Sequence, residues 1–170
     1  MEVTSTQNIW QEFADKHNGN LTTNGKNQYR VEIEKEHLKL KLSSFKKGLG
    51  GPNSFRTSVV CIGKNTPDFE FNIRHQGLFS GILEKLGRQD FQVFDTYFDD
   101  NFIIQGSNEN KVCNFFQDEQ IRNFIPKSYE LSFALNNNVL TYEARGFINE
   151  LSILDCLVSL MTKSSEKLGL

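Results

Sequence analysis

The chain has 170 residues, and 19 basic against 21 acidic residues give a formal net charge of −2 at pH 7. Charges of both signs are spread along the sequence without blocks, which argues against nucleic acid or an anionic membrane as a partner. The three cysteines are widely spaced and odd in number, which argues against a disulfide framework and indicates free thiols in a reducing compartment.

The length matches one globular domain, 1–170, and a chain of this size buries roughly 70% of the surface that its unfolded form exposes. Fifteen Phe, four Tyr and one Trp supply apolar area for that core. The segment MEVTSTQNIWQEF has no basic region followed by an apolar one, so we expect no secretory signal there. No segment approaches the roughly 18 uncharged apolar residues of a membrane span. We therefore expect a cytoplasmic protein, with neither membrane nor nucleic acid among its partners.

Residues 5–18 are predicted to form an amphipathic helix that Gly19 ends. One stripe of this helix carries Ile9, Trp10, Phe13, Ala14 and His17. Alternation with a period of two then predicts four strands, at 29–34, 38–42, 55–62 and 68–74. We expect these strands to form an antiparallel meander with one solvated face, with the third strand in a central position.

The second half of the chain is predicted to add helices and a second hairpin. Residues 78–87 have the spacing of a short helix laid on the sheet, and 94–125 contains two more short helices. The hairpin pairs 129–135 with 139–146 around three asparagines. The closing helix, 149–167, has an apolar stripe wider than the ~100° of a helix that covers one core. Either it lies deep against the sheet, or its extra flank meets another subunit.

Together these elements predict an α+β fold. Its antiparallel sheet combines the four-stranded meander with the second hairpin, and the N-terminal, middle and C-terminal helices pack on one face. We also expect a homo-oligomer, formed through the C-terminal helix or through a sheet edge.

The candidate ligand site is a carboxylate cluster, Asp95, Asp99 and Asp100, together with Arg122. Carboxylates this close in sequence bind hard cations through oxygen, or repel one another until one is protonated and serves as a general acid. The spacing does not fit an EF-hand loop. The simpler interpretation, which we favour, is a turn whose aspartates are solvated or cap a helix. Whether a metal binds there stays open.

No other motif brings catalytic groups together. The glycine-rich segment 46–53 joins two strands and lacks the GK[ST] of a phosphate-binding loop. The three histidines are dispersed along the chain. Cys113 is the best candidate for a reactive thiol, but burial is the favoured interpretation for it. No cofactor is expected. Phe115 and Phe116 belong to the core or line a pocket.

In its layout the chain resembles small bacterial α+β proteins of unknown function, through the segments FDTYFDDNFII, FF, DEQIRNFI and LTYEARGFIN. The resemblance implies no catalytic residue. We therefore expect a non-catalytic cytoplasmic binding or protein-interaction module with an unidentified protein or small-molecule partner. The alternative is a metal-dependent hydrolase that uses Asp95, Asp99 and Asp100. Whether the chain is an enzyme stays open, and a role without catalysis is favoured.

Overall fold

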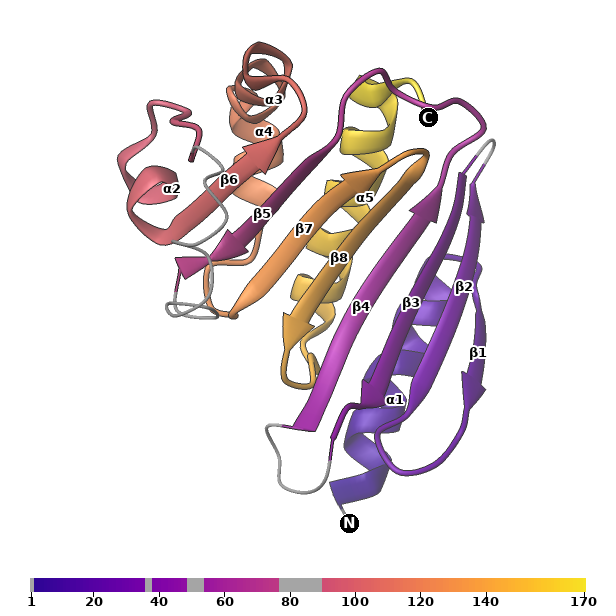
Figure 1. The fold of residues 1–170 in the computed structure, drawn as a ribbon. Coiled ribbons are helices and arrows are strands. Elements are labelled where there is room, and N and C mark those ends of the chain that lie inside the picture. The colour runs from indigo at the N-terminus through magenta and orange to yellow at the C-terminus, as the bar shows by residue number, and fades with distance from the viewer. Residues whose placement is uncertain (1, 36–37, 49–53, 77–89) are drawn as a thin grey trace.

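The computed structural model describes residues 2–35, 38–48, 54–76 and 90–170, which are organised around one antiparallel sheet of eight strands. Across the sheet the strands follow the order β1-β2-β3-β4-β8-β7-β5-β6. Figure 1 shows α1 and α5 crossing behind the sheet, while no helix of the described residues lies on the face toward the viewer. In the described part of the chain, the sheet therefore has one helix-covered face and one face without helices, which is called the open face below.

The described residues form the eight strands of this sheet and five helices. The strands are β1 (Asn20–Thr23), β2 (Tyr29–Lys35), β3 (Leu38–Lys46), β4 (Phe55–Ile62), β5 (Phe71–His75), β6 (Phe102–Gly106), β7 (Leu131–Asn136) and β8 (Val139–Arg145). The helices are α1 (Glu2–Lys16), α2 (Thr96–Asn101), α3 (Glu109–Phe116), α4 (Glu119–Phe124) and α5 (Leu151–Leu168).

Alternation along the strands separates the covered face from the open one, because successive side chains of a strand point to opposite sides. In β2, Tyr29, Val31 and Ile33 are buried, and Glu32 and Glu34 are exposed. The covered face continues from β2 to β8 through directly paired residues, Val31↔Leu42, Leu42↔Val59 and Val59↔Tyr142. All of these residues are buried.

Aromatic contacts fix the helices to the covered face. Trp10 of α1 is fully buried, stacks on Tyr29 with ring centroids 5.5 Å apart, and donates its Nε1 hydrogen to the Ile148 carbonyl at 3.2 Å. At the other end of the sheet, Phe71 of β5 stacks on Phe115 of α3 at 5.0 Å. The phenylalanines predicted as core or pocket are therefore core.

Helix α5 lies deep against the sheet. This is the first of the two explanations given above for its wide apolar stripe. Its buried residues are Leu154, Leu157, Val158, Leu160, Met161, Ser164 and Ser165. It ends at Gly169, whose φ of 68° is in the left-handed region that glycine adopts without strain. Self-association through this helix or a sheet edge stays a prediction.

The predicted α+β class, the antiparallel sheet and its helix-covered face are confirmed, but the strand arrangement is wrong in detail. The sheet also contains β1 and β6, so the real meander is β1 to β4. The predicted fourth strand begins only at Phe71 and pairs with β6 and β7, while β4 pairs with β8. The predicted helix 78–87 lies outside the described residues. Within the part of the chain that is described, no helix is long and apolar enough to cross a membrane.

Candidate functional site

Asp95 of the predicted cluster holds local structure in place. Its Oδ1 accepts a hydrogen bond from the backbone N–H of Phe98 at 3.1 Å, so it caps the N-terminus of α2. Its Oδ2 lies 3.0 Å from Nε of Arg122 in α4. Arg122 also donates to the Phe116 carbonyl at 2.6 Å. The pair therefore ties α2 to the α3–α4 connection, and the side chain of Arg122 is only 16% exposed.

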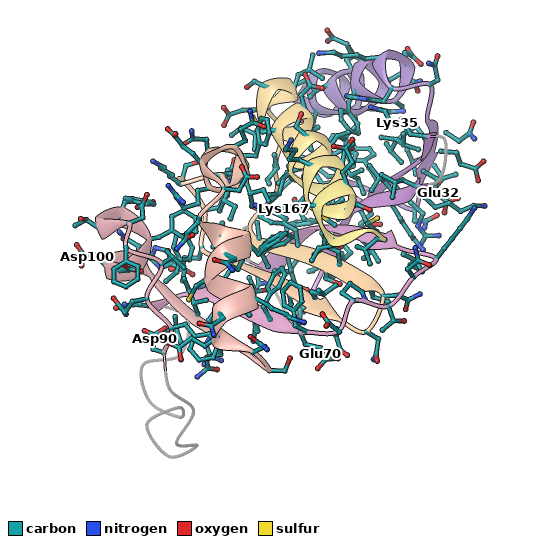
Figure 2. The ribbon with its side chains drawn as sticks, turned by 90° about the horizontal axis from the view of Figure 1, so that it is seen from above. Glu32, Lys35, Glu70, Asp90, Asp100 and Lys167 are labelled. Atoms are coloured by element: carbon teal, nitrogen blue, oxygen red, sulfur yellow. The ribbon has the colours of Figure 1, made fainter. Side chains whose placement is uncertain are left out.

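The other two carboxylates of the cluster point elsewhere. Asp99 accepts a hydrogen bond from the backbone N–H of Val93 at 2.9 Å. Asp100 is exposed, and Figure 2 shows it at the periphery of the molecule. Among the described residues, no group of three or more His, Cys, Asp or Glu side chains is arranged to hold a metal ion. That these residues bind some other ligand stays a prediction.

A carboxylate that the sequence did not reveal, Asp90, lies near Asp99. Its Oδ1 accepts from the backbone N–H of Ile104 in β6 at 2.7 Å. Burial raises the pKa of Asp90, against the effect of that hydrogen bond, and the negative charge of Asp99 raises it further. Burial also lowers the pKa of Arg74 in β5, against the attraction of Asp90. Asp90 was missed because it stands alone in sequence, outside any motif.

Two adjoining cavities flank α5 on its β2–β3 side and form what we call the α5 groove. The larger has a volume of about 560 Å³ and is lined by Lys35, Leu38, Thr162, Ser165, Glu166, Gly169 and Leu170. The smaller, of about 270 Å³, is lined by His17, Lys35, Val158, Ser159, Thr162, Lys163 and Glu166. Because three lining residues are common to both, the cavities form one elongated depression. Its volume suits a small-molecule site.

The wall of the α5 groove combines three apolar side chains with several polar and charged ones. The charged side chains are Lys35, Lys163 and Glu166. Leu38 comes from the start of β3, and Leu170 is placed by the backbone hydrogen bond from its N–H to the Ser165 carbonyl at 3.1 Å. Halfway along, the hydroxyl oxygen of Thr162 is buried and has no hydrogen-bond partner among the described residues. Lys35, labelled in Figure 2, lines both cavities. It forms no ion pair within the described part of the chain.

The N-terminal end of the α5 groove is fixed by charge. His17 and Lys16, at the end of α1, contact Asp155 of α5 at 2.7 and 2.6 Å. Burial acts to raise the pKa of Asp155, but the hydrogen bonds and charges of Lys16 and His17 outweigh it and lower the pKa. These contacts hold the end of α1 against α5 at this end of the groove.

Comparison with known proteins gives a likeness of fold. No family model matches the chain, and no curated protein matches it by sequence. Among solved structures, the crystal structure of the mycobacterial trehalose monomycolate transport factor A superposes with a TM-score of 0.59 and 10% sequence identity. The match covers 95% of this chain and 93% of that one. At this identity the likeness establishes the fold alone, which agrees with the resemblance to small α+β proteins as far as the fold class.

The function expected from the sequence is corrected by this comparison. A non-catalytic cytoplasmic binding or protein-interaction module was expected, with a metal-dependent hydrolase as the alternative, whereas the structural neighbour is a transport factor. The hydrolase is also wrong on physical grounds. Asp95 and Asp99 direct oxygens at backbone N–H groups and Arg122, and Asp100 does not join them.

Proposed function

We propose that this chain acts in lipid transport, as a factor that shelters one acyl chain of an amphiphile in the α5 groove. The observation that carries the proposal is the groove itself, an elongated depression with Leu38, Val158 and Leu170 on its wall. A fold shared with the mycobacterial trehalose monomycolate transport factor A supports it.

The physical basis is burial of methylene groups. Each CH₂ that leaves water for an apolar wall gains about 0.8 kcal/mol, and a groove needs no directional contact to hold a saturated chain. The same groove also carries the charged side chains of Lys35, Lys163 and Glu166, and the buried hydroxyl oxygen of Thr162. Lys35 lies beside both cavities and offers a cation to an acidic headgroup or to a carbonyl oxygen at the groove entrance.

The experiment is a titration with cis-parinaric acid, a fatty acid whose fluorescence rises in apolar surroundings. We expect saturable binding by the full chain and strong weakening in Thr162→Phe, because the larger side chain occupies the middle of the groove. Ser152→Phe is the matched control, because Ser152 is exposed on the same helix and lines neither cavity. This control should bind like the unmodified chain.

Two results would count against the proposal. One is the absence of saturable binding to the unmodified chain. The other is equal binding by Thr162→Phe and Ser152→Phe, both folded by circular dichroism, since the fatty acid would then lie outside the groove. Lengthening the acyl chain gives an independent check. Each added CH₂ that fits should tighten binding by a factor of about four, which corresponds to about 0.8 kcal/mol.

A further inference from the structure

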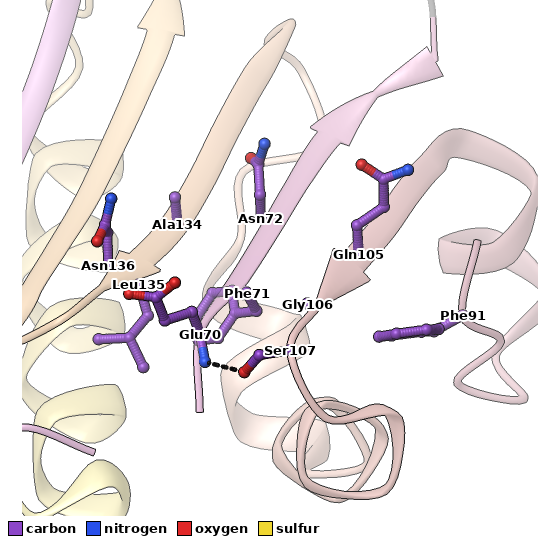
Figure 3. A pocket seen from close by; sticks show the side chains of 10 residues that line it. All are labelled: Glu70, Phe71, Asn72, Phe91, Gln105, Gly106, Ser107, Ala134, Leu135 and Asn136. Carbon is purple, nitrogen blue, oxygen red and sulfur yellow. Dashed lines mark hydrogen bonds between the residues drawn. The ribbon is translucent and has the colours of Figure 1, made fainter. Parts of the chain in front are cut away.

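A recess on the open face of the sheet has a chemistry different from that of the α5 groove. Its volume is about 530 Å³, and it lies where β5, β6 and β7 run side by side. Figure 3 shows Asn72, Gln105 and Asn136 pointing to the same side of these strands, with the small side chain of Ala134 between them. This depression is called the amide recess below.

Strand register explains why the amides converge. Asn72 pairs with Gln105 on one side and with Ala134 on the other. Directly paired residues have Cβ atoms about 4.5–5.5 Å apart, so the three side chains form a row across the strands. Asn136 follows Ala134 by two residues and therefore faces the same side. The row therefore places carboxamides from three strands around the methyl group of Ala134.

The hydrogen-bonding capacity of the amide recess suits hydroxyl groups. Each carboxamide supplies one acceptor oxygen and two N–H donors, and a ligand hydroxyl both donates and accepts. The Asn72 amide has no hydrogen-bond partner among the described residues. Asn136 accepts from the Asn137 amide at 2.8 Å through its Oδ1, which leaves its own N–H groups to donate. Gln105 accepts from Arg74 at 3.4 Å, and Arg74 lies beside the row because it pairs with Ile103.

The lower wall of the amide recess adds a carboxylate and a hydroxyl. Oε1 of Glu70 accepts from the backbone N–H of Asn137 at 3.0 Å, and its second oxygen remains an acceptor. Ser107 Oγ accepts from the Glu70 N–H at 2.9 Å, so its own O–H is able to donate. A Cβ added at Gly106 would lie 2.4 Å from the Glu70 carbonyl oxygen. Glycine at that position is therefore what lets Ser107 approach Glu70 so closely.

Phe91 completes the amide recess as its apolar side. The ring is only partly buried and stands at the edge of the depression in Figure 3. An aromatic ring beside amides and a single carboxylate matches a ligand with hydroxyls on its rim and C–H groups on its face, as a sugar ring has. The carboxylate of Glu70 disfavours an anionic ligand, and the amides disfavour an acyl chain, which would leave them without partners.

We propose that the amide recess is a binding site for a neutral polyhydroxylated ligand, of the class of mono- and disaccharides. The observation behind it is the convergence of Asn72 and Asn136, with Glu70 and Ser107 below them and Phe91 beside them. The amide recess and the α5 groove share no lining residue, so the proposal does not depend on the α5 groove.

The experiment is a titration of the isotope-labelled full chain with trehalose, a neutral disaccharide without an acyl chain, followed by NMR. We expect the side-chain NH₂ signals of Asn72 and Asn136 to shift in a saturable way at millimolar sugar. Asn72→Ala and Asn136→Ala should each weaken binding about fivefold, the effect of losing one hydrogen bond. Gln120→Ala is the control, because it removes an exposed amide from α4 on the covered side and should leave the affinity unchanged.

Three outcomes would overturn the proposal. The first is the absence of saturable shifts at the recess. The second is binding that survives both asparagine substitutions in folded protein. The third is tighter binding of inorganic phosphate than of trehalose at the same residues, since that would make the recess an anion site. None of these results bears on cis-parinaric acid binding. The sugar-site proposal and the lipid-groove proposal are therefore tested independently of each other.

Discussion

Replacing Thr162 by valine tests the physical description of the α5 groove. The hydroxyl oxygen of Thr162 is buried without a hydrogen-bond partner, and a buried hydroxyl in that state costs about 1–3 kcal/mol. Valine keeps the branched shape and has nearly the same helix propensity, so removing the oxygen brings little cost of its own. We expect the free energy of unfolding to rise by about 1 kcal/mol, near the low end of that range.

The assay is urea unfolding, followed by circular dichroism, together with a thermal scan. For a chain of this size an increase of about 1 kcal/mol raises Tm by about 2–4 °C. Thr141→Val, the same substitution at a partly exposed position on the open face, is the control and should change stability by less than about 0.5 kcal/mol. A lower urea midpoint for Thr162→Val at an unchanged m-value would refute the reasoning, because it would mean that the hydroxyl has a partner.

Two further predictions concern the helix ends around the candidate sites. The pKa of Asp155 is lowered in the folded state, so its carboxylate contributes stability that is complete above the unfolded value of about 3.9 and is lost as pH falls through the folded pKa. Asp155→Asn should therefore lower the urea midpoint at pH 7 and flatten its decline in acid; an unchanged midpoint–pH curve would contradict this. Phe94 is 88% exposed and has a φ of 61°, in the left-handed backbone region, where a bulky residue costs about 1–2 kcal/mol. Phe94→Asn should raise Tm, because asparagine tolerates this conformation, and a fall in Tm would show that the phenylalanine makes a stabilising contact.

Side-chain alternation was a sufficient guide to much of the sheet. It located β2, β3, β4, β7 and β8, because each of these strands buries every second residue. It failed for β1, whose NLTT sequence is mostly exposed and has no apolar alternation to detect. It also failed for β6, because the apolar run at its start continues the aromatic segment of α2.

The order of the strands in the sheet could not be predicted from local sequence patterns. The predicted meander assumed that neighbours in sequence are neighbours in the sheet, which is the common case. Here β4 pairs with β8, so residues 63–138 are inserted between two adjacent strands. Nothing in the alternation of either strand specifies its partner, since both bury one face in the same way.

Capping was predictable, and the cavities were not. Aspartate is preferred at the position before a helix, and the capping interpretation of the cluster holds for Asp95, whose Oδ1 accepts from the Phe98 N–H at 3.1 Å. The α5 groove, by contrast, is assembled from Lys35, Leu38 and Thr162, which are far apart in the chain. Each of these residues looks ordinary in its own segment, so only the tertiary packing reveals the groove.

The pairing of β4 with β8 also determines the order in which the sheet is completed. Strands β1 to β4 need only local contacts, which form early, whereas the edge of β4 stays unpaired until Val139–Arg145 has been synthesised and folded. During that interval Val60 and Ile62 stand on a bare strand edge that is able to pair with another chain. Slow folding, and aggregation when synthesis is fast or the chain is truncated before β8, are the expected kinetic consequences of this topology.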